Sequence, residues 1–398
     1  IIGSSAYLVE REKNSEKNKK SKSHIEFYHH SVSLEMKEFF FLKVLTLLAL
    51  LGQLHVDASE VISLPHLNIK PSGVSTTGCS HAGDMAHQLQ IAFSAHIKNT
   101  CVFAGQPYRC AVQKFANDEQ VPQTVESSVP FCDGCDEGLT LAYDHCKNHP
   151  EWVDVGMLPD YVKRACDPSN NYKDCIDDYH NLFDTRAFLF LGTQDSCYLP
   201  GSVENVAGLY GQLVSHPEEQ IKFVGTEPFP HTLPYNWTAH FNSSEPANYD
   251  GPGECLRHIY KDEITWAGEY KKKNEFVFDQ LEFWETEDPS QMTNGTGAQE
   301  KGSIYIPTRC QKLHECKMMI VPSKCDSEPS LSGGDQEWSK YGETNDIVVF
   351  KPCVGGYLDK ERFPNAMEVG RGLFDVYGQR VLRLRHAEWP AHEDDRKD

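Results

Sequence analysis

Hydrophobic positions along the chain fall into short apolar runs separated by stretches with helical spacing. Residues 187–191 (Ala-Phe-Leu-Phe-Leu) contain no polar position, which is typical of a strand buried on both faces of a parallel sheet. Helical spacing of apolar residues occurs over 84–97 and again near 203–214. Further strands are predicted at 72–77, 221–224, 303–306, 318–321 and 346–350. Strands that alternate with helices predict an α/β fold with an open, mostly parallel sheet and helices on both faces.

The start of the chain differs in composition from the rest. Residues 1–35 mix Lys, Glu, Asn and Ser without apolar periodicity, and are predicted to be a disordered leader or a gene-model extension. A basic start, an apolar run over 39–51 and a small residue at Ala58 then predict a secretory signal peptide, 36–58. A membrane anchor is the alternative interpretation, but the run is shorter than the ~20 residues that span a bilayer. Residues 59–398 are predicted to form a single domain, with no later segment apolar enough to span a membrane.

The cysteine content and the charge restrict the class of protein. All 14 cysteines lie after residue 58, and most should pair as disulfides if the chain is exported. Cys310 and Cys316 are expected to pair locally, and 110–180 is predicted to be a Cys-rich, disulfide-stapled insertion. Glycosylation sequons at three positions agree with a secreted, extracellular protein: Asn236, Asn242 and Asn294. A net charge of −20 argues against a nucleic-acid partner.

A candidate nucleophile lies between the first predicted strand and the first predicted helix. The segment Gly78-Cys79-Ser80-His81-Ala82 departs from the pattern Gly-x-Ser-x-Gly only at its last position, where Ala is small enough for a close backbone approach. A nucleophile elbow exposes its central residue, so Ser80 is the candidate and Cys79 is expected to point into the core. The alternative interpretation is that Ser80 caps the helix.

Two further polar residues follow predicted strands. Asp195 comes after the strand at 187–191, and His231 lies in a short loop after the strand at 221–224. The order Ser, Asp, His is that of α/β-hydrolases, whose triad residues lie on loops beyond strand ends. In such a triad His231 would accept the Ser80 proton, and Asp195 would orient and stabilise the imidazole. Taken singly, Asp195 could cap a helix and His231 could be a surface residue.

Several short motifs resemble those of the extracellular poly(3-hydroxybutyrate) depolymerases, and the single-domain fungal form in particular. They occur in the family's order over most of 62–378: Leu64-Pro65, Asn68, Gly73-Val74-Ser75, Gly78-x-Ser80, Met85-Ala86-x-Gln88-Leu89, Val102-Phe103-Ala104-Gly105-x-Pro107-Tyr108-x-Cys110, Gly192-x-x-Asp195, His231-Thr232, Asn248-Tyr249-Asp250-Gly251, and Ile304-Tyr305-Ile306-Pro307 followed by Cys310 and Cys316. The resemblance implies a circularly permuted α/β-hydrolase catalytic domain over 59–398. It implies ester hydrolysis through an acyl-Ser80 intermediate, on this polyester or a related short-chain hydroxyacid ester, without a metal or an organic cofactor.

The resemblance also implies an oxyanion hole and a substrate surface. The oxyanion donors would be the backbone N–H groups of His81, which follows the nucleophile, and of Cys325, which follows the strand at 318–321. Phe374 and Tyr377 would supply aromatic contacts to the substrate.

Two departures from the family pattern keep other functions open. Ser323-Lys324 stands where the family has His-Gly before the oxyanion cysteine, and the segment 370–378 lacks the family's Trp. A general secreted carboxylesterase for another ester is therefore one alternative. A catalytically impaired, disulfide-rich binding protein of the same fold is the other.

One group of cysteines and histidines also has the composition of a zinc site. It consists of Cys132, Cys135, His145, Cys146 and His149. In a secreted chain, disulfides are the commoner use of cysteines, and they are the preferred interpretation. The full disulfide connectivity and the oligomeric state stay open at this point.

Overall fold

The computed structural model of the protein describes residues 61–108, 110, 146–164, 176–235, 249–261, 263–283, 299–324 and 329–354. All of them lie in one unit that runs from Ser59 to Asp398. The predicted leader 1–35, the predicted signal peptide 36–58 and much of the insertion 110–180 lie outside the described residues. Among the described helices, none is long and apolar enough to cross a membrane.

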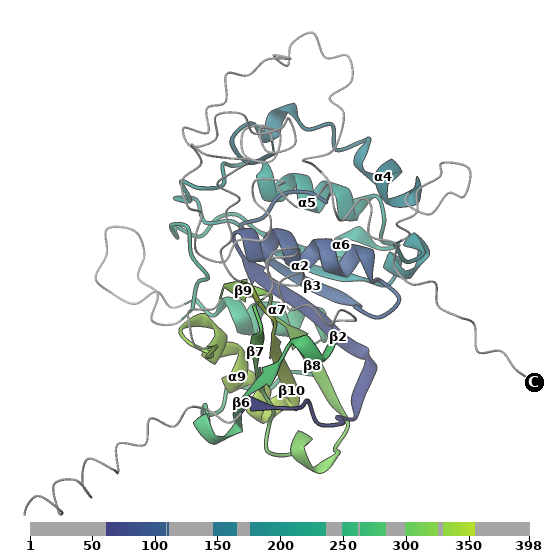
Figure 1. Ribbon diagram of the computed structural model, residues 1–398. Coiled ribbons are helices and arrows are strands. Elements are labelled where there is room, and N and C mark those ends of the chain that lie inside the picture. Colours follow the sequence, from purple (N-terminus) through teal and green to yellow (C-terminus); the bar gives the residue numbers. More distant parts are fainter. Residues whose placement is uncertain are drawn as a thin grey trace, which may run out of the picture. The chain divides into compact units, whose positions relative to one another are not determined.

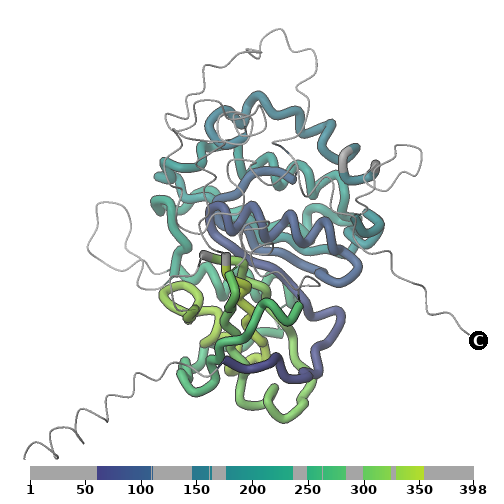
Figure 2. Tube along the Cα trace, in the orientation of Figure 1, coloured from purple at the N-terminus to yellow at the C-terminus, as the bar shows by residue number. Residues whose placement is uncertain are grey.

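A nine-stranded sheet runs through the described residues in the order β1-β6-β7-β10-β8-β2-β3-β4-β5 (Figure 1). Figure 2 shows the path of the chain in the same orientation. Its strands are β1 (Val61–Ile62), β2 (Ile69–Cys79), β3 (Asn99–Phe103), β4 (Arg186–Phe190), β5 (Ile221–Val224), β6 (Glu275–Asp279), β7 (Lys301–Tyr305), β8 (Cys316–Ile320) and β10 (Ile347–Lys351). Neighbouring strands are parallel except at β7, which is antiparallel to both β6 and β10. β9 (Ser323–Lys324) and β11 (Cys353–Val354) form a separate parallel pair. The predicted mostly parallel sheet is confirmed.

Helices cover both faces of the sheet, also as predicted. The longer helices are α2 (His81–Ala92), α5 (Ser202–Gly211), α7 (Gly251–Ile259) and α9 (Gly334–Asn345). The shorter elements are α4 (Leu158–Arg164), α6 (Pro217–Gln220) and the 3₁₀ turns η3 (Pro150–Trp152), η5 (Tyr179–Leu182), η6 (Lys272–Asn274), η7 (Leu281–Phe283) and η8 (Cys310–Lys312). Side chains alternate between faces along a strand, so Val102 and Leu189 pack toward α2 and α5, whereas Phe103 and Phe188 pack toward α7 and α9.

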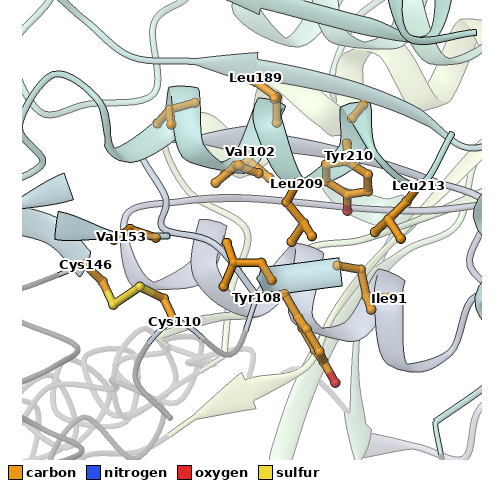
Figure 3. Packing of buried hydrophobic residues seen from close by; sticks show 14 of the residues in the cluster. Ile91, Val102, Tyr108, Cys110, Cys146, Val153, Leu189, Leu209, Tyr210 and Leu213 are labelled. Carbon is orange, nitrogen blue, oxygen red and sulfur yellow. A yellow bond between two sulfur atoms is a disulfide. The ribbon is translucent and has the colours of Figure 1, made fainter. Parts of the chain in front are cut away.

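Figure 3 shows the core between the sheet and the helices α2 and α5. Ile91 of α2, Val102 of β3, Leu189 of β4 and Tyr210 of α5 are packed together there. Residues 187–191 are at most 4% exposed, which confirms the prediction of a strand buried on both faces. Each large apolar side chain buried in this way stabilises the fold by roughly 1.5–3 kcal/mol.

The sequence pattern missed the strands β3 and β6 and the helices α7 and α9. β3 begins with the polar residues Asn99 and Thr100, which obscure its apolar pattern although both are buried. The side-chain oxygen Oδ1 of Asn99 accepts the backbone N–H of Arg186 at 3.0 Å, and the Thr76 hydroxyl donates to the Thr100 hydroxyl at 3.1 Å. These hydrogen bonds offset the cost of burying the polar groups, so the strand is stable in the middle of the sheet.

Three disulfides have both cysteines among the described residues. They are Cys101–Cys255, Cys110–Cys146 and Cys310–Cys316. The last confirms the predicted local pairing. The first joins β3 to α7 across 154 residues of chain, and no spacing in the sequence indicated it.

Candidate active site

The candidate triad residues lie on loops at one edge of the sheet. β2, β3, β4 and β5 are parallel neighbours. Ser80 directly follows β2, whereas Asp195 and His231 lie in the loops after β4 and β5. The carboxyl ends of parallel strands meet at the same edge, so the topology carries all three residues there.

Ser80 occupies a strained turn between β2 and α2. Its φ of 62° and ψ of −135° are rare for residues other than Gly, and such a conformation costs on the order of 1–3 kcal/mol. Two backbone hydrogen bonds hold it: the Ser80 N–H donates to Phe103 at 2.8 Å, and its carbonyl accepts the Asp84 N–H at 3.0 Å. The Ser80 side chain makes no capping hydrogen bond with α2, so the structure does not support the helix-cap interpretation. The backbone has the geometry of a nucleophile elbow.

Two glycines allow α2 to start directly over the end of β2. A Cβ at Gly78 would lie 2.1 Å from the carbonyl oxygen of Ala82, so no larger residue fits at that position. A Cβ at Gly83 would lie 3.1 Å from the carbonyl oxygens of Gly78 and Phe103. The usual elbow pattern has its second glycine at the position of Ala82. In this chain Gly83, one residue later, is the second glycine that lies close to the neighbouring backbone.

Asp195 and His231 form a hydrogen-bonded pair. His231 Nδ1 is 2.8 Å from Asp195 Oδ2, and Asp195 Oδ1 accepts the N–H groups of Cys197 at 2.7 Å and Tyr198 at 2.9 Å. Burial by itself would raise the pKa of the Asp195 carboxyl, but the bonds from His231 and the two amides outweigh it and lower the pKa below its usual 3.8. The carboxylate therefore stays ionised and can stabilise a protonated imidazole. Its amide partners lie in a loop before α5, so Asp195 does not cap a helix.

The expected triad also requires a hydrogen bond from the Ser80 hydroxyl to His231. Within the described residues, no hydrogen bond joins the Ser80 hydroxyl to His231. Catalytic hydrogen bonds are often long without substrate and tighten only when it binds. The direct Ser80–His231 contact stays a prediction.

Tyr198 connects His231 to the first turn of α2. Its ring stacks on the His231 ring, with centroids 5.6 Å apart and an interplanar angle of 8°. Its hydroxyl donates to Asp84 Oδ2 at 2.7 Å, and both residues are buried. Sequence reasoning missed this pair, because an acidic residue in the first turn of a helix is ordinary and Tyr198 belongs to no motif.

Cys79, next to the candidate nucleophile, packs against the core cluster that contains Phe103 and Phe190. Burial, with smaller contributions from the charges of Asp195 and Asp84, raises the pKa of its thiol to about 12. The thiol is therefore protonated and unsuited to act as a nucleophile, which agrees with the expectation that Ser80 holds that position.

The proposed oxyanion region is described only in part. His81 is the first residue of α2, so its N–H group belongs to the helix N-terminus beside Ser80. β8, from late in the chain, pairs in parallel with β2, the strand that precedes Ser80, as the circularly permuted fold implies. Six residues with predicted roles lie outside the described residues: Cys325, Phe374, Tyr377, Asn236, Asn242 and Asn294.

One of the candidate zinc ligands in the Cys-rich segment cannot bind a metal, because its sulfur is in a disulfide. Cys146 is disulfide-bonded to Cys110. His149 stacks on Trp152, with ring centroids 3.9 Å apart. The remaining members of the group, Cys132, Cys135 and His145, lie outside the described residues.

The strand order and the positions of these loops define an α/β-hydrolase fold, and known proteins share parts of the sequence. No family model matches the chain. A poly(3-hydroxybutyrate) depolymerase of Delftia acidovorans is 23% identical over 320 residues, which cover 77% of this chain and 56% of that protein. A polyhydroxybutyrate depolymerase of Talaromyces funiculosus is 22% identical over 320 residues, which cover 77% of this chain and 80% of that protein. The chain thus spans little more than half the length of the bacterial relative.

Solved structures of PHB depolymerases have the same fold. The enzyme from Penicillium funiculosum matches with a TM-score of 0.56 and 21% identity, over 75% of this chain and 84% of that one. A PHB depolymerase with a Ser-to-Ala substitution, in complex with an R3HB trimer, matches with a TM-score of 0.55 and 21% identity, over 82% of this chain and 96% of that one. The resemblance to the PHB depolymerases is confirmed in sequence and in fold.

Proposed function

We propose that the protein is a secreted serine esterase that hydrolyses poly(3-hydroxybutyrate) or a related short-chain hydroxyacid ester. The observation that carries the proposal is the Asp195–His231 hydrogen bond at the sheet edge where the strained Ser80 turn lies. The names of the relatives support the substrate class, since they are depolymerases of this polyester and one is bound to an R3HB trimer.

In the proposed reaction His231 Nε2 accepts the Ser80 proton while Ser80 Oγ attacks the ester carbonyl carbon. The N–H groups of His81 and Cys325 stabilise the resulting oxyanion. The carbon–oxygen bond to the leaving group then breaks, His231 returns the proton to the departing alkoxide, and acyl-Ser80 remains. Water then attacks the acyl carbon and gives one proton to His231. The bond between the acyl carbon and Ser80 Oγ breaks, the acid leaves, and His231 returns the proton to Ser80 Oγ. No metal or organic cofactor takes part.

Export is part of the proposal. Three disulfides among the described residues are typical of an oxidising compartment. The signal-peptide pattern at 36–58 and the three sequons agree with it. The expected location is therefore extracellular, where a solid polyester would be encountered.

The decisive test of the mechanism is Ser80→Ala, assayed on a polyester suspension by loss of turbidity and on p-nitrophenyl butyrate. Activity on both substrates should fall by roughly 10⁴-fold or more, as removal of a triad nucleophile generally does. Ser215→Ala is the matched control, because Ser215 precedes β5 at the opposite edge of the sheet. Retention of more than a few per cent of activity by Ser80→Ala would show that the nucleophile is another residue.

The substrate is tested separately, because a solid polymer must be held by side chains exposed at the mouth of the site. Leu199, shortly after Asp195, is 38% exposed, and we propose Leu199 and Phe374 as two such side chains. Phe374→Ala should weaken polymer degradation more than p-nitrophenyl butyrate hydrolysis. Phe183→Ala is the control, because Phe183 is exposed but precedes β4 at the opposite edge.

Each alternative function predicts a different result in these assays. Equal loss on both substrates, or no polymer activity in the unmodified protein, would favour a general carboxylesterase. Polymer binding without hydrolysis of either substrate would favour the impaired binding protein. The substitution of Ser323-Lys324 for His-Gly is the sequence feature that makes this last outcome worth testing.

A further inference from the structure

The Cys197 thiol lies beside the Asp195–His231 pair and has no part in the proposed reaction. Three donor atoms, one from each of Asp195, Cys197 and His231, lie within 4.8 Å of one another. Cys197 is a free, half-buried cysteine. Its own backbone N–H donates to Asp195 Oδ1 at 2.7 Å, which fixes this part of the loop close to the carboxylate.

A carboxylate, an imidazole and a thiolate are the ligands that zinc prefers in proteins. With zinc–ligand distances of about 2.0–2.3 Å, tetrahedral coordination separates nitrogen and oxygen ligands by about 3.3 Å. His231 Nδ1 and Asp195 Oδ2 are now 2.8 Å apart, so the pair needs to open only slightly. Three protein ligands leave a fourth position for water.

A second group of donor atoms provides an internal comparison. Cys310, Cys316 and Asp346 also come within 4.8 Å of one another, but both of these cysteines are joined in a disulfide. Among the described residues, only the group around Cys197 combines this spacing with a free thiol.

We propose that Asp195, Cys197 and His231 form a site for Zn²⁺, or for a divalent cation of similar affinity for sulfur, and that occupancy blocks catalysis. Binding releases the Cys197 thiol proton to solvent, so the thiolate and the carboxylate balance the charge of the cation. His231 coordinates the cation through Nδ1 and carries its single ring proton on Nε2. That nitrogen then has no lone pair to accept the Ser80 proton, and the carboxylate no longer orients the ring. Inhibition is reversible, because the cation is held by coordination bonds alone and no side chain is covalently modified.

Binding and inhibition are measured separately on the purified full-length protein. Zinc binding is measured by titration calorimetry, and ligation by sulfur is measured with Co²⁺ through its thiolate charge-transfer absorption. Cys197→Ser should lose the absorption and bind zinc at least roughly tenfold more weakly, since one ligand is gone. Cys79→Ser, which changes the other free cysteine of the described residues, should retain both. Ser80→Ala should also still bind zinc, so the result does not depend on the proposed esterase function.

In the activity assay, ZnCl₂ should inhibit p-nitrophenyl butyrate hydrolysis by the unmodified protein, and excess chelator should restore it. The zinc concentration for half inhibition should rise at least roughly tenfold in Cys197→Ser, each protein being compared with itself without zinc. Equal zinc binding by the unmodified protein and Cys197→Ser, or no binding at millimolar zinc, would overturn the proposal. Zinc binding that needs Cys197 in a protein without esterase activity would uphold the metal site and refute the proposed function instead.

Discussion

At the scale of single residues, the His231 ring is held from two directions. The Asp195 carboxylate is hydrogen-bonded to His231 Nδ1 at the edge of the ring, and the Tyr198 ring stacks on its face. Tyr198 is itself anchored by the hydrogen bond from its hydroxyl to Asp84. Asp84 belongs to the helix that begins after Ser80, so this chain of contacts ties the candidate base to the element that carries the candidate nucleophile.

Tyr198→Phe should lower kcat by about tenfold with little change in KM, because small misplacements of a catalytic group are costly. The substitution keeps the stacked ring but removes its tether to Asp84. Tyr210→Phe is the matched control: it removes a buried hydroxyl bonded to Gln90 at 2.7 Å, on the same face of the sheet. Steady-state kinetics and thermal unfolding are measured for both variants. If kcat falls equally in both, Tyr198 has only a structural role.

At the scale of secondary structure elements, a long-range disulfide ties the centre of the sheet to the helix layer that covers it. Cys101 of β3 and Cys255 of α7 are fully buried, and their bond closes a loop of 154 residues. The bond Cys310–Cys316 is also buried but closes a loop of only 6 residues. The two pairs therefore differ mainly in the chain entropy that each removes from the unfolded state.

Replacing both members of each pair by Ala tests that difference. By loop entropy, loss of Cys101–Cys255 should lower the free energy of unfolding by about 5 kcal/mol, and loss of Cys310–Cys316 by about 2 kcal/mol. Denaturant unfolding of the two double variants gives both values. Equal losses would mean that local packing, rather than loop length, determines what these bonds contribute.

At the scale of the whole molecule, Glu343 joins α9 to the turns that flank β6 and β7. Its carboxylate accepts hydrogen bonds from Lys271 at 2.5 Å, Thr308 at 2.6 Å, Tyr305 at 2.8 Å and Asn274 at 2.9 Å. Burial would raise the pKa of Glu343, but these bonds outweigh it and lower the pKa from 4.5 to about 2.

This lowered pKa predicts part of the acid sensitivity of the fold. A carboxyl group with a lower pKa in the folded state stabilises the protein above its unfolded pKa, and the stabilisation is lost as pH falls through the folded pKa. The free energy of unfolding should therefore decrease between about pH 4.5 and about pH 2. Glu343→Gln should be less stable at neutral pH and should flatten this decrease. Chemical unfolding across the pH range measures both, and an unchanged slope would contradict the assignment.

The sequence by itself determined the features that a few neighbouring residues encode. The apolar run 187–191 identified a buried strand, because exclusion of polar groups from both faces is a local property of the chain. The alternation of strands and helices was sufficient for the fold class. Gly78-x-Ser80 indicated the strained turn, since only small residues permit that backbone approach. The short spacing of Cys310 and Cys316 indicated their pairing.

Only the tertiary structure decided the features that depend on residues far apart in the chain. β3 was missed because its polar residues become favourable in the core only after Arg186 and Thr76 bond to them. The stacking of Tyr198 on His231 and the position of the Cys197 thiol likewise follow from two loops meeting at one edge of the sheet. Such contacts leave no periodic pattern, because a side chain's partners are set by packing and not by its neighbours in sequence.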